Sequence, residues 1–324
     1  MKYAKLGNSD LEVSKLCIGC MSFGKAGTMH DWTLDEEKSE EVIAHALDLG
    51  INFFDTANQY SAGTSEEYLG RALKKHVSRD KVIIASKVFF NEGHLSSKAI
   101  HREIEGTLTR LGTDYLDLYI IHRFDYATPI EETMEALNDL IKEGKVRAIG
   151  ASAMFGYQFH DMQIAAKDHG WTPFCAMENH YNLLYREDER EMMPICREMN
   201  VGLMPYSVLA AGRLSRLAWS TDTLRSKTDQ VAHRKYDSTE DEDYPIVLRV
   251  HELAEKYHTT MTRIALAWMY AKGVTSPIVG ITKTKYLDDA AGAVDLTLTD
   301  EDIAYLEELY APHKIIGANY KNPD

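Results

Sequence analysis

Short apolar runs alternate along the chain with longer segments whose apolar positions recur at helical spacing. The runs end abruptly, as in residues 51–55, where the last residue is an acid. Buried parallel strands have this nearly continuous apolar character, and the intervening segments suit crossover helices. We therefore expect strands near residues 16–21, 51–55, 82–87, 116–122, 146–151, 174–178, 201–205 and 275–280.

Helices are expected between these strands because a glycine follows several of the periodic segments, as Gly50, Gly112, Gly144 and Gly170 do. Glycine adopts the left-handed conformation that ends many helices. Strands and helices in this alternation are typical of a (β/α)8 barrel, so we expect one α/β domain over residues 1–324. The expected helices span residues 35–49, 65–76, 96–111, 130–143, 156–169 and 186–199.

Further segments lie outside the minimal barrel. Residues 1–15 predict a β-hairpin, because two short strand-like segments flank a turn-rich tetrapeptide at residues 7–10. Residues 22–34 and 207–244 predict long loops after the first and seventh strands. Loops in these positions lie over the C-terminal ends of the strands, where barrel enzymes carry their active sites.

Composition narrows the classes of partner. The 324 residues are 44% hydrophobic, enough for a packed core, and carry a formal net charge of −14. This charge argues against nucleic acid or an anionic membrane as the main partner. We find no signal-peptide pattern and no apolar run that approaches a membrane span. Cys17 and Cys20 lie three apart in an expected strand, on opposite faces, so we expect reduced cysteines and a cytoplasmic protein.

Consecutive expected strands place one ionisable residue each at their C-terminal ends, namely Asp55, Lys87 and His122. Neighbouring strands are about 4.8 Å apart, so these side chains can converge at the barrel mouth. Tyr60, on the loop after Asp55, can fold back over them. A buried lysine requires a partner, which Asp55 supplies.

These four residues suit the reduction of a carbonyl group. We expect the Lys87 ammonium to lower the pKa of Tyr60 from its reference value of about 10, so that the tyrosine donates a proton near neutral pH. His122 can orient the same carbonyl oxygen. The four residues form neither a nucleophile–base pair nor a metal cage, so the hydride is expected from a cofactor.

The cofactor would bind across the barrel mouth, since no Gly-x-Gly-x-x-Gly segment follows an expected strand. Residues 207–214 are one candidate phosphate-binding segment, because Gly212 lets backbone amides approach an anion. Residues 280–285 are another, because they open a helix after the eighth strand. Tyr206 can stack on a flat ring.

The residues that carry this chemistry resemble the aldo/keto reductases along essentially the full chain. The chain looks most like the branch of aryl-alcohol dehydrogenase-like and versiconal hemiacetal acetate reductase-like enzymes. The resemblance implies that Asp55, Tyr60, Lys87 and His122 are the catalytic tetrad, with Tyr60 as the general acid and NADPH as the usual hydride donor. The matching motifs are Asp55-Thr-Ala-x-x-Tyr60, Lys87, Leu118-Tyr-Ile-Ile-His122-Arg, Gly144-Lys-Val-Arg-Ala-Ile-Gly150, Asn179-His-Tyr-Asn-Leu-Leu-Tyr-Arg186-Glu187 and Ala210-x-Gly-Arg-Leu214.

The same resemblance implies a set of cofactor contacts. Ser152 would bind the nicotinamide amide, Tyr206 would stack on the ring, and Gly19 and Met21 would line the wall beside it. The remaining contacts would be Ser207, Leu209, Gly212 and Leu214 around the pyrophosphate, Gly280, Thr282 and Lys283 at the adenosine 2′-phosphate, and Asp289 near the adenine.

Several positions depart from the family pattern. Glu178 stands where relatives usually have the Gln that holds the nicotinamide amide. An ionised glutamate accepts hydrogen bonds but cannot donate one, and its charge would favour the oxidised cofactor. Ala153 stands where many relatives have Asn, and Tyr286 and Ala290 replace residues of the adenine helix. NADPH is therefore expected in preference to NADH, without a strict requirement.

The alternatives belong to other functional classes. A redox-sensing module would hold the same cofactor with slow turnover, although the complete tetrad argues against it. A Schiff-base lyase would use Lys87 as its nucleophile, but pairing with Asp55 keeps the lysine charged. For a reductase we expect a small aryl or hydrophobic carbonyl substrate, because aromatic residues lie on the loops beside the site, namely Trp32, Phe89, Phe90 and Phe124.

Overall fold

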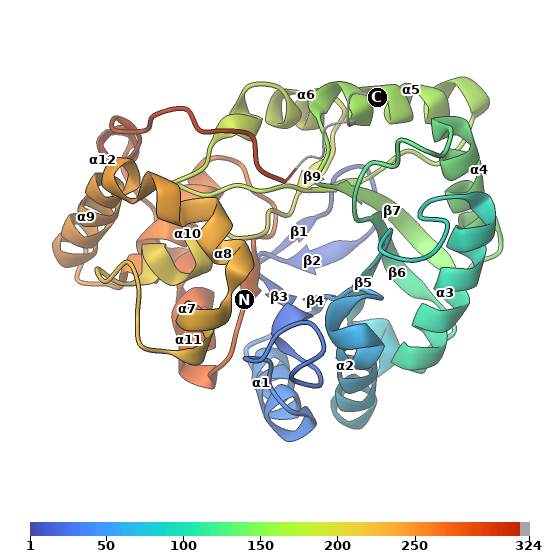
Figure 1. Ribbon diagram of the computed structural model, residues 1–324, viewed down its shortest axis with the longest axis horizontal. Helices are drawn as coiled ribbons and strands as arrows, with labels where there is room; N and C mark the ends of the chain where they lie inside the picture. Colours follow the sequence, from blue (N-terminus) through green and yellow to red (C-terminus); the bar gives the residue numbers. More distant parts are fainter. Residues whose placement is uncertain (318–324) are drawn as a thin grey trace.

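A computed structural model describes residues 1–317 (Figure 1). Within this range, eight parallel strands form one sheet in the order β10-β3-β4-β5-β6-β7-β8-β9. Neighbouring strands in the chain are therefore neighbours in the sheet, as in a (β/α)8 barrel. The strands are β3 (Cys17–Gly19), β4 (Phe53–Asp55), β5 (Ile83–Val88), β6 (Leu116–Ile121), β7 (Val146–Ser152), β8 (Ala176–Glu178), β9 (Gly202–Leu203) and β10 (Ile278–Gly280).

Backbone hydrogen bonds join the two edge strands and close the sheet. The amide of Thr275 donates to the carbonyl of Leu203, and the amide of Ile278 donates to the carbonyl of Pro205, each at 2.9 Å. Each strand thus has a partner on both sides, which removes the exposed edges of an open sheet. The expected (β/α)8 barrel is confirmed.

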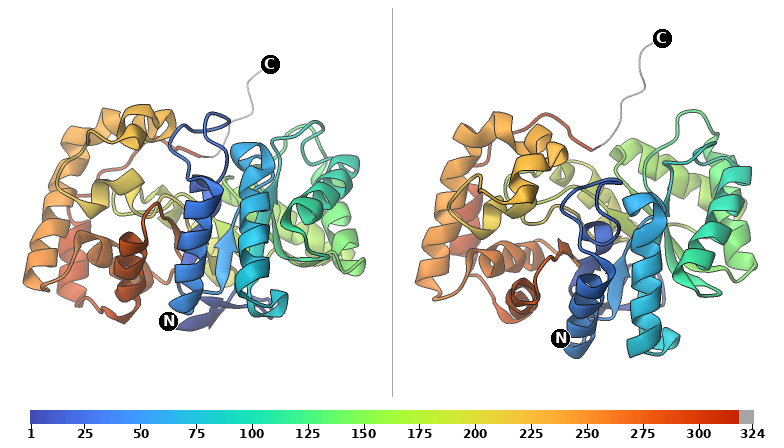
Figure 2. Two further views of the ribbon diagram at one scale, coloured as in Figure 1. Left: turned by 90° about the horizontal axis from the view of Figure 1, so that it is seen from below. Right: turned by 60° about the horizontal axis from the view of Figure 1, so that its bottom comes forward.

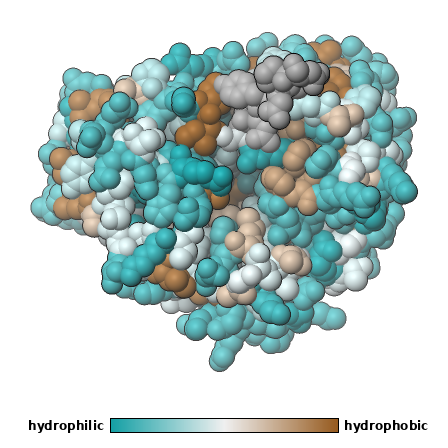
Figure 3. All heavy atoms as spheres, in the orientation of Figure 1, coloured by the Kyte–Doolittle hydropathy of each residue, from teal (hydrophilic) through white to brown (hydrophobic). Residues whose placement is uncertain are grey.

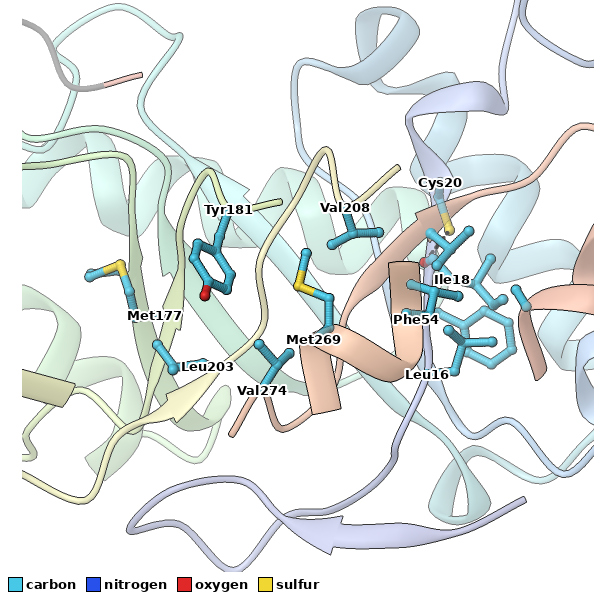
Figure 4. Packing of buried hydrophobic residues seen from close by; sticks show 14 of the residues in the cluster. Leu16, Ile18, Cys20, Phe54, Met177, Tyr181, Leu203, Val208, Met269 and Val274 are labelled. Carbon is cyan, nitrogen blue, oxygen red and sulfur yellow. Dashed lines mark hydrogen bonds between the residues drawn. The ribbon is translucent and has the colours of Figure 1, made fainter. Parts of the chain in front are cut away.

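Alternate residues of each strand point into the barrel and toward the surrounding helices. Both sides are apolar, which explains the continuous apolar runs. Phe53 belongs to the cluster inside the barrel, and its neighbour Phe54 belongs to the layer between strands and helices. Figure 4 shows this outer layer, in which Leu16 and Ile18 lie near Phe54. The helices that surround the strands are α1 (Glu36–Asp48), α2 (Thr64–His76), α3 (Ser97–Leu111), α4 (Ile130–Lys142), α5 (Gly156–His169), α6 (Met192–Glu198), α10 (Met261–Ala271) and α11 (Thr284–Gly292).

The N-terminal hairpin closes one end of the barrel. Strands β1 (Tyr3–Lys5) and β2 (Glu12–Ser14) pair in antiparallel fashion, as expected. Leu6, Leu11 and Val13 are buried against the residues inside the barrel. Figure 2 shows the hairpin and the loop at residues 22–34 at opposite ends of the molecule, so the C-terminal ends of the strands remain available for a ligand.

The C-terminal half contains more helix than the sequence pattern indicated. The segment after β9 includes a 3-10 helix (Ala210–Ser215) and two short helices, α7 (Leu224–Thr228) and α8 (Gln230–Tyr236). Their local caps, such as the Asp229 carboxylate that accepts from the Ala232 amide at 3.0 Å, stabilise helices too short to show periodicity. Helices α9 (Glu240–Lys256) and α12 (Asp300–Glu307) complete the fold.

Helix α6 is shorter than the sequence pattern predicted. The helix expected at residues 186–199 begins only at Met192, because Arg186 instead forms ion pairs with Glu189 and Glu307. Among residues 1–317 we find no helix of the length and apolar character that a membrane crossing requires.

Candidate active site

The catalytic candidates converge at the C-terminal ends of β4, β5 and β6. Asp55 is the last residue of β4, Lys87 is the penultimate residue of β5, and His122 follows β6. Tyr60 begins a tight turn in which Ser61 and Ala62 have left-handed φ angles of 48° and 54°. This turn directs the chain back over the barrel and buries the Tyr60 side chain.

Lys87 is the centre of the cluster. Its ammonium donates hydrogen bonds to the Asp55 carboxylate at 2.5 Å, to the Thr56 carbonyl at 2.9 Å and to the Tyr60 hydroxyl at 3.3 Å. The side chain is completely buried, so all three donors act inside the protein. Burial alone would lower the pKa of Lys87, but Asp55 and Glu178 outweigh burial and raise it well above the usual value. The lysine is therefore a permanent cation beside the tyrosine.

His122 packs edge-to-face against the Tyr60 ring. The two ring centroids are 5.8 Å apart, with an interplanar angle of 78°. Burial, followed by the charges of Lys87 and Arg123, lowers the pKa of His122 well below its usual value. The imidazole is therefore neutral at physiological pH, and one ring nitrogen can donate a hydrogen bond to a substrate oxygen.

The expected lowering of the Tyr60 pKa is wrong in its net direction. Burial raises this pKa above the usual value, and the carboxyl groups of Asp55 and Glu178 add to the increase. The Lys87 ammonium lowers it, as expected, but does not outweigh the other effects. Tyr60 therefore keeps its proton throughout the neutral range, and proton transfer requires an acceptor more basic than a phenolate.

Glu178 also belongs to this cluster. It ends β8, and its carboxylate lies 3.4 Å from the Lys87 ammonium. Burial is the main cause that raises its pKa to about 8, followed by repulsion from Asp55. Ser152, the neighbouring residue on β7, donates to the Glu178 backbone carbonyl at 2.8 Å. The sequence placed Glu178 at the nicotinamide amide but did not reveal its contact with Lys87.

The segment after β9, expected to bind a phosphate, turns sharply several times. Ser207, Ala210, Ala211 and Gly212 have φ angles between 48° and 95°, which turns the chain sharply at each position. The amides of Ala210 and Gly212 donate within the loop, to the carbonyls of Ser207 and Leu209, each at 2.8 Å. Among the expected contacts, Ser207, Leu209 and Gly212 are partly exposed, whereas the Leu214 side chain is fully buried in the apolar core.

Tyr206 is part of an aromatic stack at the barrel mouth. The His180 ring stacks on it, with the centroids 5.3 Å apart, and the Lys235 ammonium lies 4.5 Å from the Tyr206 centroid. A cavity of about 270 Å³ lies beside this stack and reaches Ala153 and Asn179. None of the four tetrad residues lines this cavity.

The residues expected near the adenosine lie around β10 and α11. Gly19 pairs with Gly280, and a side chain at Gly19 would approach the Ile278 side chain to 2.8 Å, so the close strand contact requires glycine there. Met21 follows β3 and is half-buried, Thr282 is half-buried, and Lys283 is exposed just before α11. The Asp289 carboxylate is already paired with Arg263 at 3.0 Å, which limits its availability to an adenine.

Three basic residues near the barrel mouth had no role predicted from the sequence. Within residues 1–317, Arg123, Arg216 and Lys235 have no carboxylate partner within ion-pair distance, although buried atoms or lowered pKa values mark each as enclosed. Burial, followed by Arg123, lowers the pKa of Lys235 to about 7. Unpaired enclosed cations are unusual in a chain with net charge −14 and indicate an anionic ligand. No pattern in the polar segment around Lys235 predicted that this lysine would contact an anionic ligand.

Both long segments meet over the barrel mouth. The Arg225 guanidinium lies 4.2 Å from the centroid of the Trp32 ring, which joins residues 22–34 to residues 207–244. Figure 3 views this face, whose surface is hollowed near its centre. In the part of the chain that the structure describes, no group of His, Cys, Asp and Glu could hold a metal ion.

Comparisons with known proteins agree with this geometry. Residues 15–311 match the aldo/keto reductase family. A Schizosaccharomyces pombe protein provisionally named an aryl-alcohol dehydrogenase is 45% identical, over 97% of each chain. Versiconal hemiacetal acetate reductase of Aspergillus parasiticus is 41% identical, over 97% of this chain and 98% of its own. The chain therefore belongs to the aldo/keto reductase family of oxidoreductases.

Proposed function

We propose that this protein reduces aldehydes or ketones to alcohols with NADPH. The observation that carries the proposal is the buried Lys87 ammonium, which contacts both Asp55 and the Tyr60 hydroxyl. This arrangement holds a proton donor beside a fixed positive charge. Carbonyl reduction requires a proton donor and a hydride donor, and the unpaired basic residues of the barrel mouth suit the phosphates of NADPH.

The residues around the mouth fit a phosphorylated dinucleotide. Arg216 and Lys235 offer enclosed positive charge without carboxylate partners among the described residues, and the Lys235 ammonium lies 3.4 Å from the Ser207 hydroxyl, where the chain turns sharply. His122 Nδ1 is buried and has no hydrogen-bond partner in that same part of the chain. Polar atoms left unpaired in a buried position indicate a ligand that completes them.

When bound, the cofactor supplies a hydride to the carbonyl carbon. Tyr60 holds the proton at its hydroxyl oxygen and delivers it to the carbonyl oxygen, which becomes an alkoxide-like base as the carbon is reduced. The alkoxide is more basic than a phenolate, so a tyrosine with a raised pKa still donates. Lys87 then stabilises the tyrosinate, while Asp55 keeps the lysine in place and charged.

His122 orients the substrate. Its neutral imidazole can donate a hydrogen bond to the carbonyl oxygen without competing with Tyr60 as the acid. Phe90 contacts the His122 ring edge-to-face, with the centroids 5.1 Å apart, and is itself 43% exposed. An exposed aromatic side chain beside the proposed reacting atoms favours an aryl or hydrophobic carbonyl, in line with the names of the two relatives above.

The preference for NADPH and the cytoplasmic location follow from exposed lysines and from the free cysteines, respectively. Lys283 and Lys285 lie at the start of α11 and are exposed, so they can bind a 2′-phosphate, which favours NADPH over NADH. All four cysteines are free and buried, which suits a reducing compartment such as the cytoplasm.

A direct assay tests the function. NADPH and NADH are compared as donors for 4-nitrobenzaldehyde and several aliphatic aldehydes, and nicotinamide absorbance is followed at neutral pH. The proposal expects rapid NADPH oxidation with the aromatic aldehyde and slower oxidation of NADH. Tight NADPH binding without turnover of any aldehyde would contradict it and would instead indicate a cofactor-sensing protein.

A further inference from the structure

The catalytic cluster contains two carboxyl groups in contact with one ammonium. Asp55 accepts a hydrogen bond from Lys87 at 2.5 Å, and Glu178 Oε2 lies 3.4 Å from the same nitrogen. Asp55, Glu178 and Lys87 are 2%, 3% and 0% exposed, so solvent screens these charges little. Two buried carboxylates cannot both ionise at low cost beside a single cation.

The remaining groups around Glu178 do not supply the missing positive charge by direct contact. Cys17 from β3 and Tyr206 after β9 are neutral, because burial raises both of their pKa values. Tyr60 and His122 are also neutral. The guanidinium of Arg123, after β6, acts on Glu178 without forming an ion pair within the described residues. One carboxyl of the cluster therefore holds a proton near neutral pH.

Glu178 is the carboxyl that carries this proton. Burial raises the pKa of Asp55 as well, but Asp55 has the direct hydrogen bond from Lys87, which stabilises its ionised form. Glu178 Oε2 has only the longer contact with the Lys87 ammonium, at 3.4 Å, and burial followed by Asp55 raises the pKa of Glu178 to about 8. The protonated side chain offers one O–H donor and one carbonyl acceptor, the same capacity as a glutamine amide, whereas the ionised form only accepts.

We propose that Glu178 is a proton-controlled specificity residue, which treats the two cofactor forms alike when protonated and favours the oxidised form when ionised. The proposal rests on the function proposed above, because it requires the nicotinamide to bind beside Glu178. It assigns to this carboxyl a role that a glutamine in the same place could not have. The protein would thus change from a reductase toward an alcohol dehydrogenase as pH rises.

The charge of Glu178 sets the direction in which cofactor preference changes with pH. An ionised Glu178 attracts the positive ring of NADP+ but not the neutral ring of NADPH. Ionisation also raises the pKa of Tyr60 further and competes with the tyrosine for Lys87, which weakens the acid. As pH rises through about 8, NADP+ affinity should increase and the rate of carbonyl reduction should fall. If NADP+ lowers the pKa of Glu178 by about one, its affinity changes by about tenfold across the titration.

Binding measurements test the proposal without turnover. Dissociation constants of NADP+ and NADPH are measured between pH 6.5 and 9 by calorimetry in two buffers of different ionisation enthalpy. The 2′-phosphate is common to both cofactors, so its titration cancels in the ratio of the two constants. For the wild type we expect the NADP+/NADPH ratio of dissociation constants to fall about tenfold with rising pH, and proton release with NADP+ alone near pH 8.

Three variants make the test specific. Glu178→Gln removes the titrating group without changing its size, so the ratio should become nearly independent of pH, whereas exposed Glu131→Gln on α4 should match the wild type. Lys235 has a pKa of about 7 and would favour NADP+ in the same direction on losing its charge, so Lys235→Met must keep the Glu178-dependent change.

The outcomes separate the two proposals. Binding of both cofactors with a ratio that is flat in the wild type, or equally pH-dependent in Glu178→Gln, overturns the role of Glu178 and leaves the reductase intact. Absence of binding by either cofactor overturns the proposed function and this inference together.

Discussion

Lys87 and the cations across the barrel mouth from it differ in how completely they are paired. On the side of β4 to β6, Lys87 uses all three donors within the protein, on Asp55, Thr56 and Tyr60. On the side of β7 to β10, Arg216 and Lys235 have no ion-pair partners in the described chain. Under the proposed function, the first side donates the proton and is the acid side, and the second holds the cofactor and is the binding side.

The paired lysine and the unpaired cations are expected to affect different quantities, namely turnover and cofactor affinity. A preorganised acid costs no rearrangement at the moment of reaction, so it contributes to turnover. Unpaired cations raise the energy of the free protein and are relieved by an anion, so they contribute to affinity. Glu178 lies on the binding side but contacts Lys87 of the acid side, which links the two.

The largest expected effect comes from removing the acid. Tyr60→Phe should lower aldehyde reduction by a factor of about 10²–10⁴, because the proton donor is absent while the ring remains. NADPH binding, followed by fluorescence, should change little. Tyr3→Phe on the N-terminal hairpin is the control and should retain full activity. Turnover of Tyr60→Phe within a few-fold of the wild type would show that another group donates the proton.

Removing the central cation should destabilise the protein. Lys87→Met leaves the carboxyl groups of Asp55 and Glu178 buried without their counter-ion, so we expect a loss of about 3–5 kcal/mol in the free energy of unfolding in denaturant at pH 8. Adding Glu178→Gln to this variant should recover part of the loss. An unchanged midpoint for Lys87→Met would mean that the ion cluster does not stabilise the fold.

Removing an unpaired cation should weaken cofactor binding without lowering the stability of the protein. Lys235→Met should weaken NADPH binding by about tenfold while leaving the free energy of unfolding unchanged or slightly higher, because no ion pair is lost. Exposed Lys98→Met on α3 is the matched control for the change in net charge. Lower stability together with unaltered NADPH affinity would place Lys235 among the structural residues instead.

The smallest effect concerns the backbone beside the cavity. Ala153 has a left-handed φ of 47°, a conformation that asparagine tolerates better than alanine. Ala153→Asn should therefore raise the free energy of unfolding by up to about 1 kcal/mol, and Ala153→Val should lower it. Thermal unfolding of both variants measures the difference, and a stabilised Ala153→Val would contradict this explanation.

The sequence predicted the acid side better than the binding side for a physical reason. Asp55, Lys87 and His122 each end an apolar strand, so strand order alone brings them together. Lys235 reaches Tyr206 only because a short helix within a polar segment folds over the mouth, and no periodic pattern marks such a helix. The direction of the Tyr60 pKa was also missed, because it depends on burial and on Glu178 across the barrel.

Transfer of labelled hydride tests the central claim most directly. The protein is incubated with 4-nitrobenzaldehyde and NADPH deuterated at the transferred position of C4, and the alcohol is analysed by mass spectrometry. We predict one deuterium on the benzylic carbon with the wild type and almost no alcohol with Tyr60→Phe. Alcohol without deuterium, or no alcohol from a protein that binds NADPH, would contradict the assignment of this barrel mouth as a carbonyl reductase site.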